Sequence, residues 1–274
     1  MILFPYAKIN IGLEVLFKRN DGYHELETVF YPIGLSDILE INPSTAFNFT
    51  QTGIDFGGHA NDNIVVKAYH LLQQKHALPN VSMHLHKQIP VGAGLGGGSS
   101  DAAFTLKGLN ELFALKLSTE ALEDYAAQLG SDCPFFIKDC PALALGRGEN
   151  LTPINLNIEK YELVLVKPPV SVTTAEAYAN IEPLIPEKTL AKTINLPVNE
   201  WKVNIENRFE KSVFAAHPEV QQIKTRLYDL GAVYAAMSGS GSAVFALFDK
   251  GNEPETNNFE GCFFWRKNMT DNFF

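Results

Sequence analysis

Five of the seven residues from Gly92 to Gly98 are glycine, and this run constrains the fold more than any other feature of the chain. Glycine tolerates positive φ and lets another group approach the backbone closely. The run follows a strand-like stretch at 81–85 and precedes an apolar helix, which we expect to begin at Ser99 and end near residue 113. A helix start presents free N–H groups and a partial positive charge. The pattern therefore predicts a cradle for an anion, most naturally for nucleotide phosphates.

Two familiar phosphate-binding motifs do not explain this segment. Gly92, Gly94 and Gly97 formally satisfy the G-x-G-x-x-G dinucleotide pattern, but polar residues precede the run and residues 111–124 resemble helix ends, where that fold needs a strand ending in an acid. The Walker pattern requires a lysine directly after its last glycine, and the sequence has none there. An ordinary flexible turn before a capped helix remains the alternative. The hydroxyls of Ser99 and Ser100 could cap the helix, bind phosphate or hold Mg²⁺.

A second stretch of small residues, Met237-Ser-Gly-Ser-Gly-Ser242, leads into a strand expected at 243–248. Its glycines suit either a close approach of this backbone to a ligand or to the first loop, or a plain turn. The sequence alone leaves these two interpretations equal.

The coarse pattern of elements favours an α+β fold. Apolar residues alternate with Lys8, Asn10, Gly12 and Glu14, as in a strand with one face toward solvent. Shorter strands are expected at 28–31, 38–41 and 163–166, and helices after Asp62, after Ser118 and from Pro218. Strands and helices alternate irregularly after a strand-rich start, unlike a doubly wound sheet. A division near residue 150 is expected, although no linker composition marks it.

Composition excludes several classes of function. The chain has 274 residues and 46% hydrophobic residues, enough for a substantial core, and its net charge is −9. Non-specific nucleic-acid binding, which needs a basic face, is therefore not expected. Cys133, Cys140 and Cys262 are odd in number and lack metal-ligand spacing, which favours a reducing compartment. With neither a membrane-length apolar run nor a signal peptide, the sequence indicates a soluble, cytoplasmic protein.

Two polar residues and one short polar segment are candidates for a catalytic or binding role. Asp132 follows a helix end and precedes apolar residues, so it could orient or deprotonate an acceptor hydroxyl in phosphoryl transfer. A nearby lysine would keep such a carboxylate ionised, and Lys8 interrupts an apolar opening. Taken alone, the two residues resemble a capping aspartate and a solvent-facing lysine. The segment 21–24, Asp-Gly-Tyr-His, resembles a hairpin turn with surface decoration.

Together these segments resemble the GHMP kinases. Residues 90–103, PVGAGLGGGSSDAA, match the central motif of that superfamily with an extended glycine run, and residues 7–30, 130–136 and 237–245 resemble further motifs in the same order. The resemblance spans nearly the whole chain. It implies a two-lobed α+β fold with the active site in the cleft between an N-terminal nucleotide-binding lobe (1–150) and a C-terminal substrate lobe (151–274).

The DGYH and GGGSS segments are most similar to one branch of this superfamily, which belongs to the non-mevalonate route to isoprenoid precursors. That similarity implies ATP-dependent phosphorylation of the 2-hydroxyl of 4-diphosphocytidyl-2-C-methyl-D-erythritol, with ATP and Mg²⁺ as cofactors. We expect no nucleic-acid or membrane partner, and a monomer or a weak homodimer.

The resemblance also implies roles for individual residues. Asp132 would be the catalytic base, and Lys8 would hold it ionised and contact the acceptor hydroxyl. Substrate would be bound by Asn10, Tyr23, His24, Thr174 and Tyr178, with the aromatic rings reading cytosine. ATP would be bound by Asn63 on the adenine side and, around its phosphates, by Pro90, Val91, Gly92, Ala93, Gly94, Leu95, Gly96, Gly97, Gly98, Ser99 and Ser100.

Two departures from the family pattern leave roles open. Asp101 stands where other members have alanine or asparagine, and an acid beside phosphates is unfavourable unless it points away. The segment 207–210, Asn-Arg-Phe-Glu, lacks the acid that often follows the asparagine. Two other hypotheses remain: a kinase of the same superfamily with another acceptor, such as homoserine or mevalonate, and a non-catalytic nucleotide or sugar sensor. Retention of both Lys8 and Asp132 argues against the sensor, and the missing βαβ context argues against a dinucleotide oxidoreductase.

Overall fold

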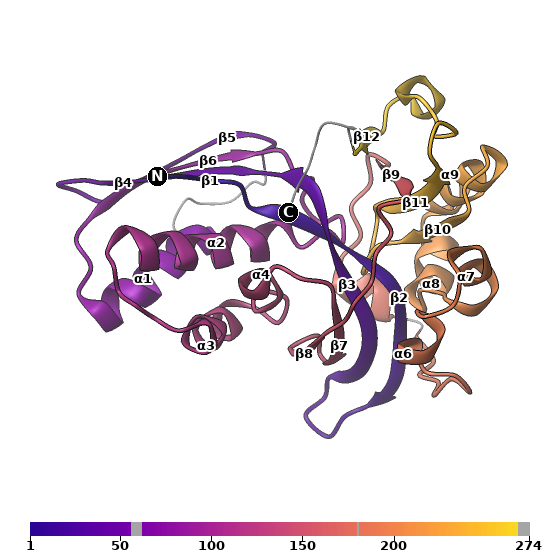
Figure 1. Cartoon of the computed structure of the whole chain (residues 1–274), viewed down its shortest axis with the longest axis horizontal. Helices are drawn as coiled ribbons and strands as arrows, with labels where there is room; N and C mark the ends of the chain where they lie inside the picture. The colour runs from indigo at the N-terminus through magenta and orange to yellow at the C-terminus, as the bar shows by residue number, and fades with distance from the viewer. Residues whose placement is uncertain (56–61, 180, 268–274) are drawn as a thin grey trace. The chain divides into compact units, whose positions relative to one another are not determined.

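The computed structural model describes residues 1–55, 62–179 and 181–267. The chain divides into two compact units that are interleaved in the sequence (Figure 1). Unit 1 comprises residues 1–7, 35–91 and 96–139, and unit 2 comprises residues 8–34, 92–95 and 140–274. The assignment of nucleotide binding to 1–150 and of substrate binding to 151–274 stays a prediction, as does a cleft between the lobes.

Unit 1 contains a four-stranded sheet in the order β1-β4-β6-β5. Its strands are β1 (Ile2–Leu3), β4 (Ile38–Pro43), β5 (Asn48–Gly53) and β6 (Val81–Lys87). β6 pairs antiparallel with β4 and parallel with β5. Buried and half-buried residues alternate along β6, as expected for a sheet with one covered face.

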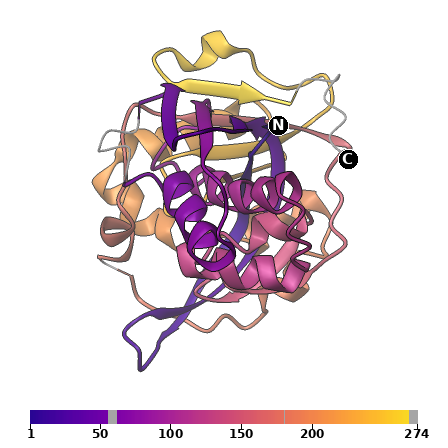
Figure 2. The same ribbon diagram turned by 90° about the vertical axis from the view of Figure 1, so that its left-hand side faces the viewer.

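The described residues of unit 1 also form α1 (Ile64–His76), α2 (Gly97–Leu112), α3 (Thr119–Leu129) and α4 (Phe135–Lys138). α1 and α2 lie side by side in both ribbon views (Figures 1 and 2). The Oγ of Ser118 accepts a hydrogen bond from the N–H of Ala121 and so caps α3, as the sequence predicts. α3 ends at Gly130, and Pro134 precedes the short α4.

Unit 2 holds most of two further four-stranded sheets, ordered β2-β3-β7-β8 and β10-β11-β9-β12. Their strands are β2 (Tyr6–Lys18), β3 (His24–Ser36), β7 (Ala142–Gly146), β8 (Asn150–Pro153), β9 (Tyr161–Lys167), β10 (Tyr234–Met237), β11 (Val244–Asp249) and β12 (Phe263–Arg266). The helices of this unit are α5 (Thr174–Tyr178), α6 (Leu190–Thr193), α7 (Val198–Asn204), α8 (Phe209–Ala216), α9 (Pro218–Asp229) and the 3₁₀ helix η2 (Thr256–Phe259).

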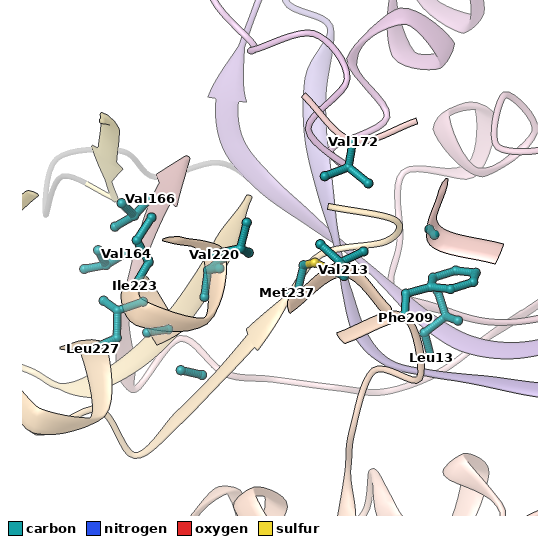
Figure 3. Close-up of a cluster of buried hydrophobic side chains, with 14 of the residues drawn as sticks. Leu13, Val164, Val166, Val172, Phe209, Val213, Val220, Ile223, Leu227 and Met237 are labelled. Carbon is teal, nitrogen blue, oxygen red and sulfur yellow. The ribbon is translucent and has the colours of Figure 1, made fainter. Parts of the chain in front are cut away.

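A hydrophobic core lies between the second sheet of unit 2 and its helices (Figure 3). Val164 and Val166 of β9 contribute to the same cluster as Val220, Ile223 and Leu227, the apolar stripe of α9. The stripe recurs every three or four residues, so one face of α9 is buried. The α+β class and the helix at 218 are thus confirmed. None of the helices in the described ranges is long and apolar enough to cross a bilayer.

Two expectations about local structure were wrong. The face of β2 that carries Lys8, Asn10 and Glu14 is buried and not turned to solvent; these side chains are 3%, 2% and 8% exposed. The alternation of polar and apolar residues did not predict burial correctly here, because other segments of unit 2 cover this face and supply polar partners for it. The glycine-rich helix begins at Gly97 and not at Ser99, with Gly96 at its N-cap in the left-handed region and no side-chain cap.

Candidate active site

Lys8 is a buried cation held by three neighbours in unit 2. Its Nζ donates hydrogen bonds to Oδ1 of Asn10 at 2.6 Å and to the carbonyl oxygen of Gly94 at 3.1 Å. It also lies 4.9 Å from the centre of the Phe30 ring. Burying an ammonium group is costly unless it is hydrogen-bonded, and these contacts supply the partners that Lys8 needs.

Asn10 links Lys8 to two strands and a loop. Its Nδ2 donates to Oγ1 of Thr28 at 2.9 Å, and Thr28 donates in turn to the carbonyl of Gly12 at 2.6 Å. The backbone N–H of Asn10 donates to Oγ of Ser238 at 3.1 Å. The Asn10 amide is therefore fixed at both ends, and its oxygen faces Lys8.

The middle of the glycine-rich segment is fastened to β2 and to the second small-residue loop by its carbonyl groups. Ala93 accepts from the N–H of Ala243 at 3.2 Å, and Leu95 accepts from the N–H of Lys8 at 2.9 Å. Gly94 accepts from Oγ of Ser238 at 2.8 Å as well as from Lys8. Three successive carbonyls, which would repel a phosphate, are thus turned toward donors of the protein.

The sign of φ alternates along the backbone of this segment. Gly92, Gly94 and Gly96 have φ of 61°, 75° and 68°, whereas Ala93 and Leu95 between them do not have positive φ. Segments in which positive-φ glycines alternate with other residues often form concavities of N–H groups that suit an anion. The anion-cradle prediction therefore has a backbone conformation to support it.

The two small-residue loops touch each other inside unit 2. A Cβ added at Gly94 would lie 1.9 Å from the carbonyl oxygen of Ser238, and one added at Gly239 would lie 3.2 Å from the Gly94 Cα. Of the two interpretations of 237–242, the close approach to the first loop is confirmed. Both positions also require positive φ, at 75° and 55°.

Asn207 and Glu210 hold this second loop from behind. Nδ2 of Asn207 donates to the carbonyls of Met237 and Gly239, both at 2.8 Å, and Oε1 of Glu210 accepts from the N–H of Met237 at 2.9 Å. Burial raises the pKa of Glu210, although Lys224, at 2.6 Å, opposes the shift. The segment 207–210, whose role the sequence left open, thus shapes the loop that carries Ser238.

The start of α2 lies in unit 1. Gly97, Gly98 and Ser99 form its first turn, so their N–H groups have no partner within the helix. Ser99 is half-buried and Ser100 is fully buried, with an Oγ that has no hydrogen-bond partner among the described residues. Neither hydroxyl caps the helix, which removes one of the three roles considered for them.

Asp132 lies in the same unit, half-buried on the turn between α3 and α4. Its neighbour Cys133 is buried, and burial raises the pKa of that thiol to about 12 despite a hydrogen bond with Ser99. The thiol therefore stays neutral and is no nucleophile. The role of Asp132 as catalytic base stays a prediction.

The aromatic candidates gather at the turn between β2 and β3 in unit 2. The ring of His24 stacks on Tyr178 at 4.8 Å between centroids and 21° between planes, and Tyr178 meets Phe209 edge-on at 4.7 Å. Tyr23 is 55% exposed, and the guanidinium of Arg147 lies 4.8 Å from its ring centre. His24 and Tyr178, far apart in sequence, are thus brought together, and the exposed Tyr23 directly precedes His24 in the chain. Thr174 is exposed in the first turn of α5, and none of these contacts involves it.

Asn63 has a structural role in unit 1. Its Oδ1 accepts from the N–H of Val65 at 2.9 Å, which caps α1, and its Nδ2 donates to Gln51 at 3.3 Å. Its contact with adenine stays a prediction.

Comparison with known proteins agrees with this geometry. The GHMP kinases N terminal domain matches residues 63–146, and the GHMP kinases C terminal domain matches residues 194–256. The 4-diphosphocytidyl-2-C-methyl-D-erythritol kinase of Bacteroides thetaiotaomicron is 54% identical over 261 residues, which cover 93% of this chain and 95% of that protein. This chain belongs to the GHMP kinase family. The enzyme of the same name from Parabacteroides distasonis is 49% identical over 98% of this chain and 100% of its own.

Solved structures support the fold of this GHMP kinase. A 4-(cytidine 5'-diphospho)-2C-methyl-D-erythritol kinase superposes with a TM-score of 0.79 at 35% identity and 90% coverage of both chains. A mevalonate kinase has a TM-score of 0.68 at 14% identity, with 97% of this chain and 98% of that chain covered, and shows the fold alone. As a GHMP kinase, the chain uses ATP. The glycine-rich segment lies within the N-terminal match and Ser238 within the C-terminal match, whereas Lys8 and Tyr23 precede both.

Sequence reasoning on this GHMP kinase missed several contributing residues. Thr28 and Arg147 gave no signal, since a strand threonine and a turn arginine are common in any fold. Ser238 lay in a stretch that the sequence did single out, but its bond to Gly94 depends on tertiary folding.

Proposed function

We propose that the chain transfers the γ-phosphoryl group of ATP to the 2-hydroxyl of 4-diphosphocytidyl-2-C-methyl-D-erythritol, which gives the 2-phosphate and ADP. The observation that carries this proposal is the identity of about half of all residues, over nearly full length, with enzymes of that name. The stacked rings of His24 and Tyr178 and the exposed ring of Tyr23 support an acceptor with a planar base.

In the proposed reaction, Asp132 accepts the proton of the 2-hydroxyl as its oxygen forms a bond to the γ-phosphorus. The bond from that phosphorus to the bridging oxygen breaks, and ADP leaves with the electron pair. Lys8 contacts the acceptor hydroxyl and favours the ionised form of Asp132. Phosphoryl transfer requires little covalent chemistry from the protein, so these groups act by orientation and electrostatics.

The phosphates of ATP are proposed to lie against the segment 90–100. Its positive-φ glycines suit an anion-binding backbone, and the first turn of α2 has N–H groups without a partner in the helix. Asn63 is proposed to lie on the adenine side. On the acceptor, Asn10 is proposed beside the reacting end, Tyr23, His24 and Tyr178 at the cytosine, and Thr174 near the same pocket.

Mg²⁺ is proposed to arrive with ATP. The described residues hold no group of three His, Cys, Asp or Glu side chains that could bind a metal. This fits a magnesium ion held mainly by substrate phosphates, with one or two oxygens from the protein. Ser99, half-buried in the first turn of α2, offers a suitable hydroxyl oxygen, and the ion would neutralise charge on the phosphates.

The experiment is ADP release by the purified protein with Mg-ATP and one acceptor at a time: 4-diphosphocytidyl-2-C-methyl-D-erythritol, methylerythritol phosphate, homoserine, mevalonate or galactose. We expect turnover only with the cytidylated acceptor. Turnover with another acceptor would retain the kinase and overturn the roles of Tyr23, His24 and Tyr178. No turnover with any of them, while ATP still binds, would favour a sensor.

The role of Asp132 is tested by Asp132→Asn, with Asp124→Asn on the exposed face of α3 as the control. We expect the first variant to bind both substrates and lose about a hundredfold to ten-thousandfold in kcat, the range of general-base contributions. Near-wild-type turnover would remove Asp132 from the mechanism.

A further inference from the structure

Three charged side chains form a buried cluster in unit 1: Asp37, Lys87 and Asp101, with exposed fractions of 0%, 5% and 2%. Asp37 lies between β3 and β4, and Lys87 is the last residue of β6. Asp101 is the fifth residue of α2, the helix that begins at the end of the glycine-rich segment. Charged groups are almost never buried this completely unless they are paired.

Lys87 joins the two carboxylates. Its Nζ donates to Oδ2 of Asp101 at 2.7 Å and to Oδ2 of Asp37. The other oxygen of Asp37 accepts from the N–H groups of Gln88 at 2.6 Å and Ile89 at 2.8 Å. Asp37 therefore binds both the lysine side chain and the backbone that follows it.

These contacts join the two ends of the glycine-rich segment. Residues 87–89 lead into it, and Gly97 and Asp101 belong to the helix that leaves it. The first turn of the helix packs directly on the lysine, since a Cβ added at Gly97 would lie 2.9 Å from Cγ2 of Ile89 and 3.0 Å from Nζ of Lys87. The cluster thus sets the spacing between entrance and exit of the loop.

The charges in the cluster do not balance if both acids are ionised. Oδ1 of Asp101 has no hydrogen-bond partner among the described residues. Burial raises the pKa of Asp101 well above its ordinary value; Lys87 opposes the shift, and the like charge of Asp37 adds to it. Burial alone would lower the pKa of Lys87, but Asp101 and Asp37 raise it. The lysine therefore stays charged, and the acid that departs from the family pattern is turned onto it.

We propose that Asp37, Lys87 and Asp101 form a clamp that positions the glycine-rich loop for the phosphates of ATP, with Asp101 as the positioning residue on the helix. This rests on the proposed function in one respect, that the loop binds ATP. The clamp explains how an acid is tolerated in the helix that receives phosphates: its carboxyl group is buried inside unit 1 and bound to Lys87.

The test compares Asp101→Ala with Asp101→Asn. Alanine removes the link to α2 but leaves the neutral pair Lys87–Asp37, so no charge is left unpaired. Asparagine keeps an oxygen that can accept from Lys87. The matched control is Asp139→Asn, which alters a different ion pair of α2, the one between Lys107 and Asp139 at 2.5 Å. Should Asp101→Ala prove insoluble, Asp101→Ser is used, because its side chain is too short to reach Lys87.

Binding of the non-hydrolysable analogue AMP-PNP with Mg²⁺ is measured by calorimetry, KM of the acceptor by ADP release, and stability by urea denaturation. We expect Asp101→Ala to weaken AMP-PNP binding about tenfold, the effect of one charge-assisted hydrogen bond, with acceptor KM within about twofold of wild type. Asp101→Asn and Asp139→Asn should bind AMP-PNP nearly as wild type does.

The clamp is overturned if Asp101→Ala binds AMP-PNP with wild-type affinity, or if acceptor KM rises by the same factor, as a general loosening of the fold would cause. It is also overturned if Asp101→Asn is as defective as Asp101→Ala, because spacing would then not be the cause. Failure of the wild-type protein to bind AMP-PNP would contradict both the ATP site and the clamp, whereas wild-type binding with an unaffected Asp101→Ala contradicts the clamp alone.

Discussion

The ammonium group of Lys8 lies 2.6 Å from the side-chain oxygen of Asn10, and both side chains are at most 3% exposed. Two residues on the same face of one strand are thus hydrogen-bonded to each other away from solvent. The pair is completed by the Gly94 carbonyl, which also accepts from Ser238. The lysine is therefore coupled to the glycine-rich segment by a direct hydrogen bond within unit 2.

Replacing Lys8 by methionine tests whether this position serves catalysis. We expect Lys8→Met to lower kcat about a hundredfold to a thousandfold, comparable to the loss of one preorganised donor, with a smaller change in ATP affinity. Lys8→Arg should not restore activity, because the larger guanidinium does not fit between Asn10 and Gly94. Lys18→Met, at the exposed end of β2, is the control. Steady-state kinetics with both substrates provide the measurement, and an active Lys8→Met would remove the residue from the reaction.

The stacked rings of His24 and Tyr178 should affect binding of the acceptor and not binding of ATP. Tyr178→Ala removes the ring that stacks on His24, and an aromatic contact contributes about 0.5–1.5 kcal/mol. We therefore expect acceptor KM to rise about three- to tenfold, with ATP KM unchanged. Tyr23→Ala should act in the same direction, whereas Tyr178→Phe, which keeps the ring, should behave as wild type. An equal rise in ATP KM would show that the two tyrosines support the fold and do not read the base.

Comparing Gly94→Ala with Gly231→Ala separates two contributions to the loss of stability, backbone strain and steric clash. At Gly231, φ is 97° and nothing lies within 4 Å of an added Cβ, so Gly231→Ala reports backbone strain alone, about 1–2 kcal/mol. At Gly94 the same strain is joined by a clash with the Ser238 carbonyl, which we expect to add about 1–3 kcal/mol. Urea denaturation of both variants measures the difference in free energy of unfolding. Equal losses would mean that the two loops move apart easily.

Glu210 should make stability depend on pH. Its pKa in the folded protein is raised from the ordinary value of 4.5, mainly by burial. A raised pKa favours folding below the unfolded value and loses that contribution as pH rises through the folded value. Measured between pH 4 and 7, the free energy of unfolding of wild type should therefore fall relative to Glu210→Gln, which lacks this titration. Glu260→Gln at an exposed position should run parallel to wild type; a wild-type curve rising relative to Glu210→Gln would contradict the shift.

Several local elements could be predicted from the sequence because their causes are local. Ser118 and Gly130 bound α3, and Pro218 starts α9, since capping and proline geometry act within one turn. The glycine-rich segment behaves in the same way: alternating positive φ at Gly92, Gly94 and Gly96 is available to glycine at little cost, whatever surrounds it. The start of α2 was misplaced by two residues because a glycine N-cap has no side chain to mark it.

The environment of the candidate site was decided by tertiary structure. Alternation along β2 indicates which residues share a face, but not whether a second segment covers the polar one. In the folded protein Gly94, Thr28 and Arg208 supply partners for its side chains. His24 meets Tyr178, and Asp101 meets Lys87 and Asp37, across long stretches of chain. The sequence by itself indicated the family, the positive-φ glycine backbone and the residue types available for phosphoryl transfer. Only folding decided which polar groups are buried together, because burial and pairing depend on segments that short-range patterns do not connect.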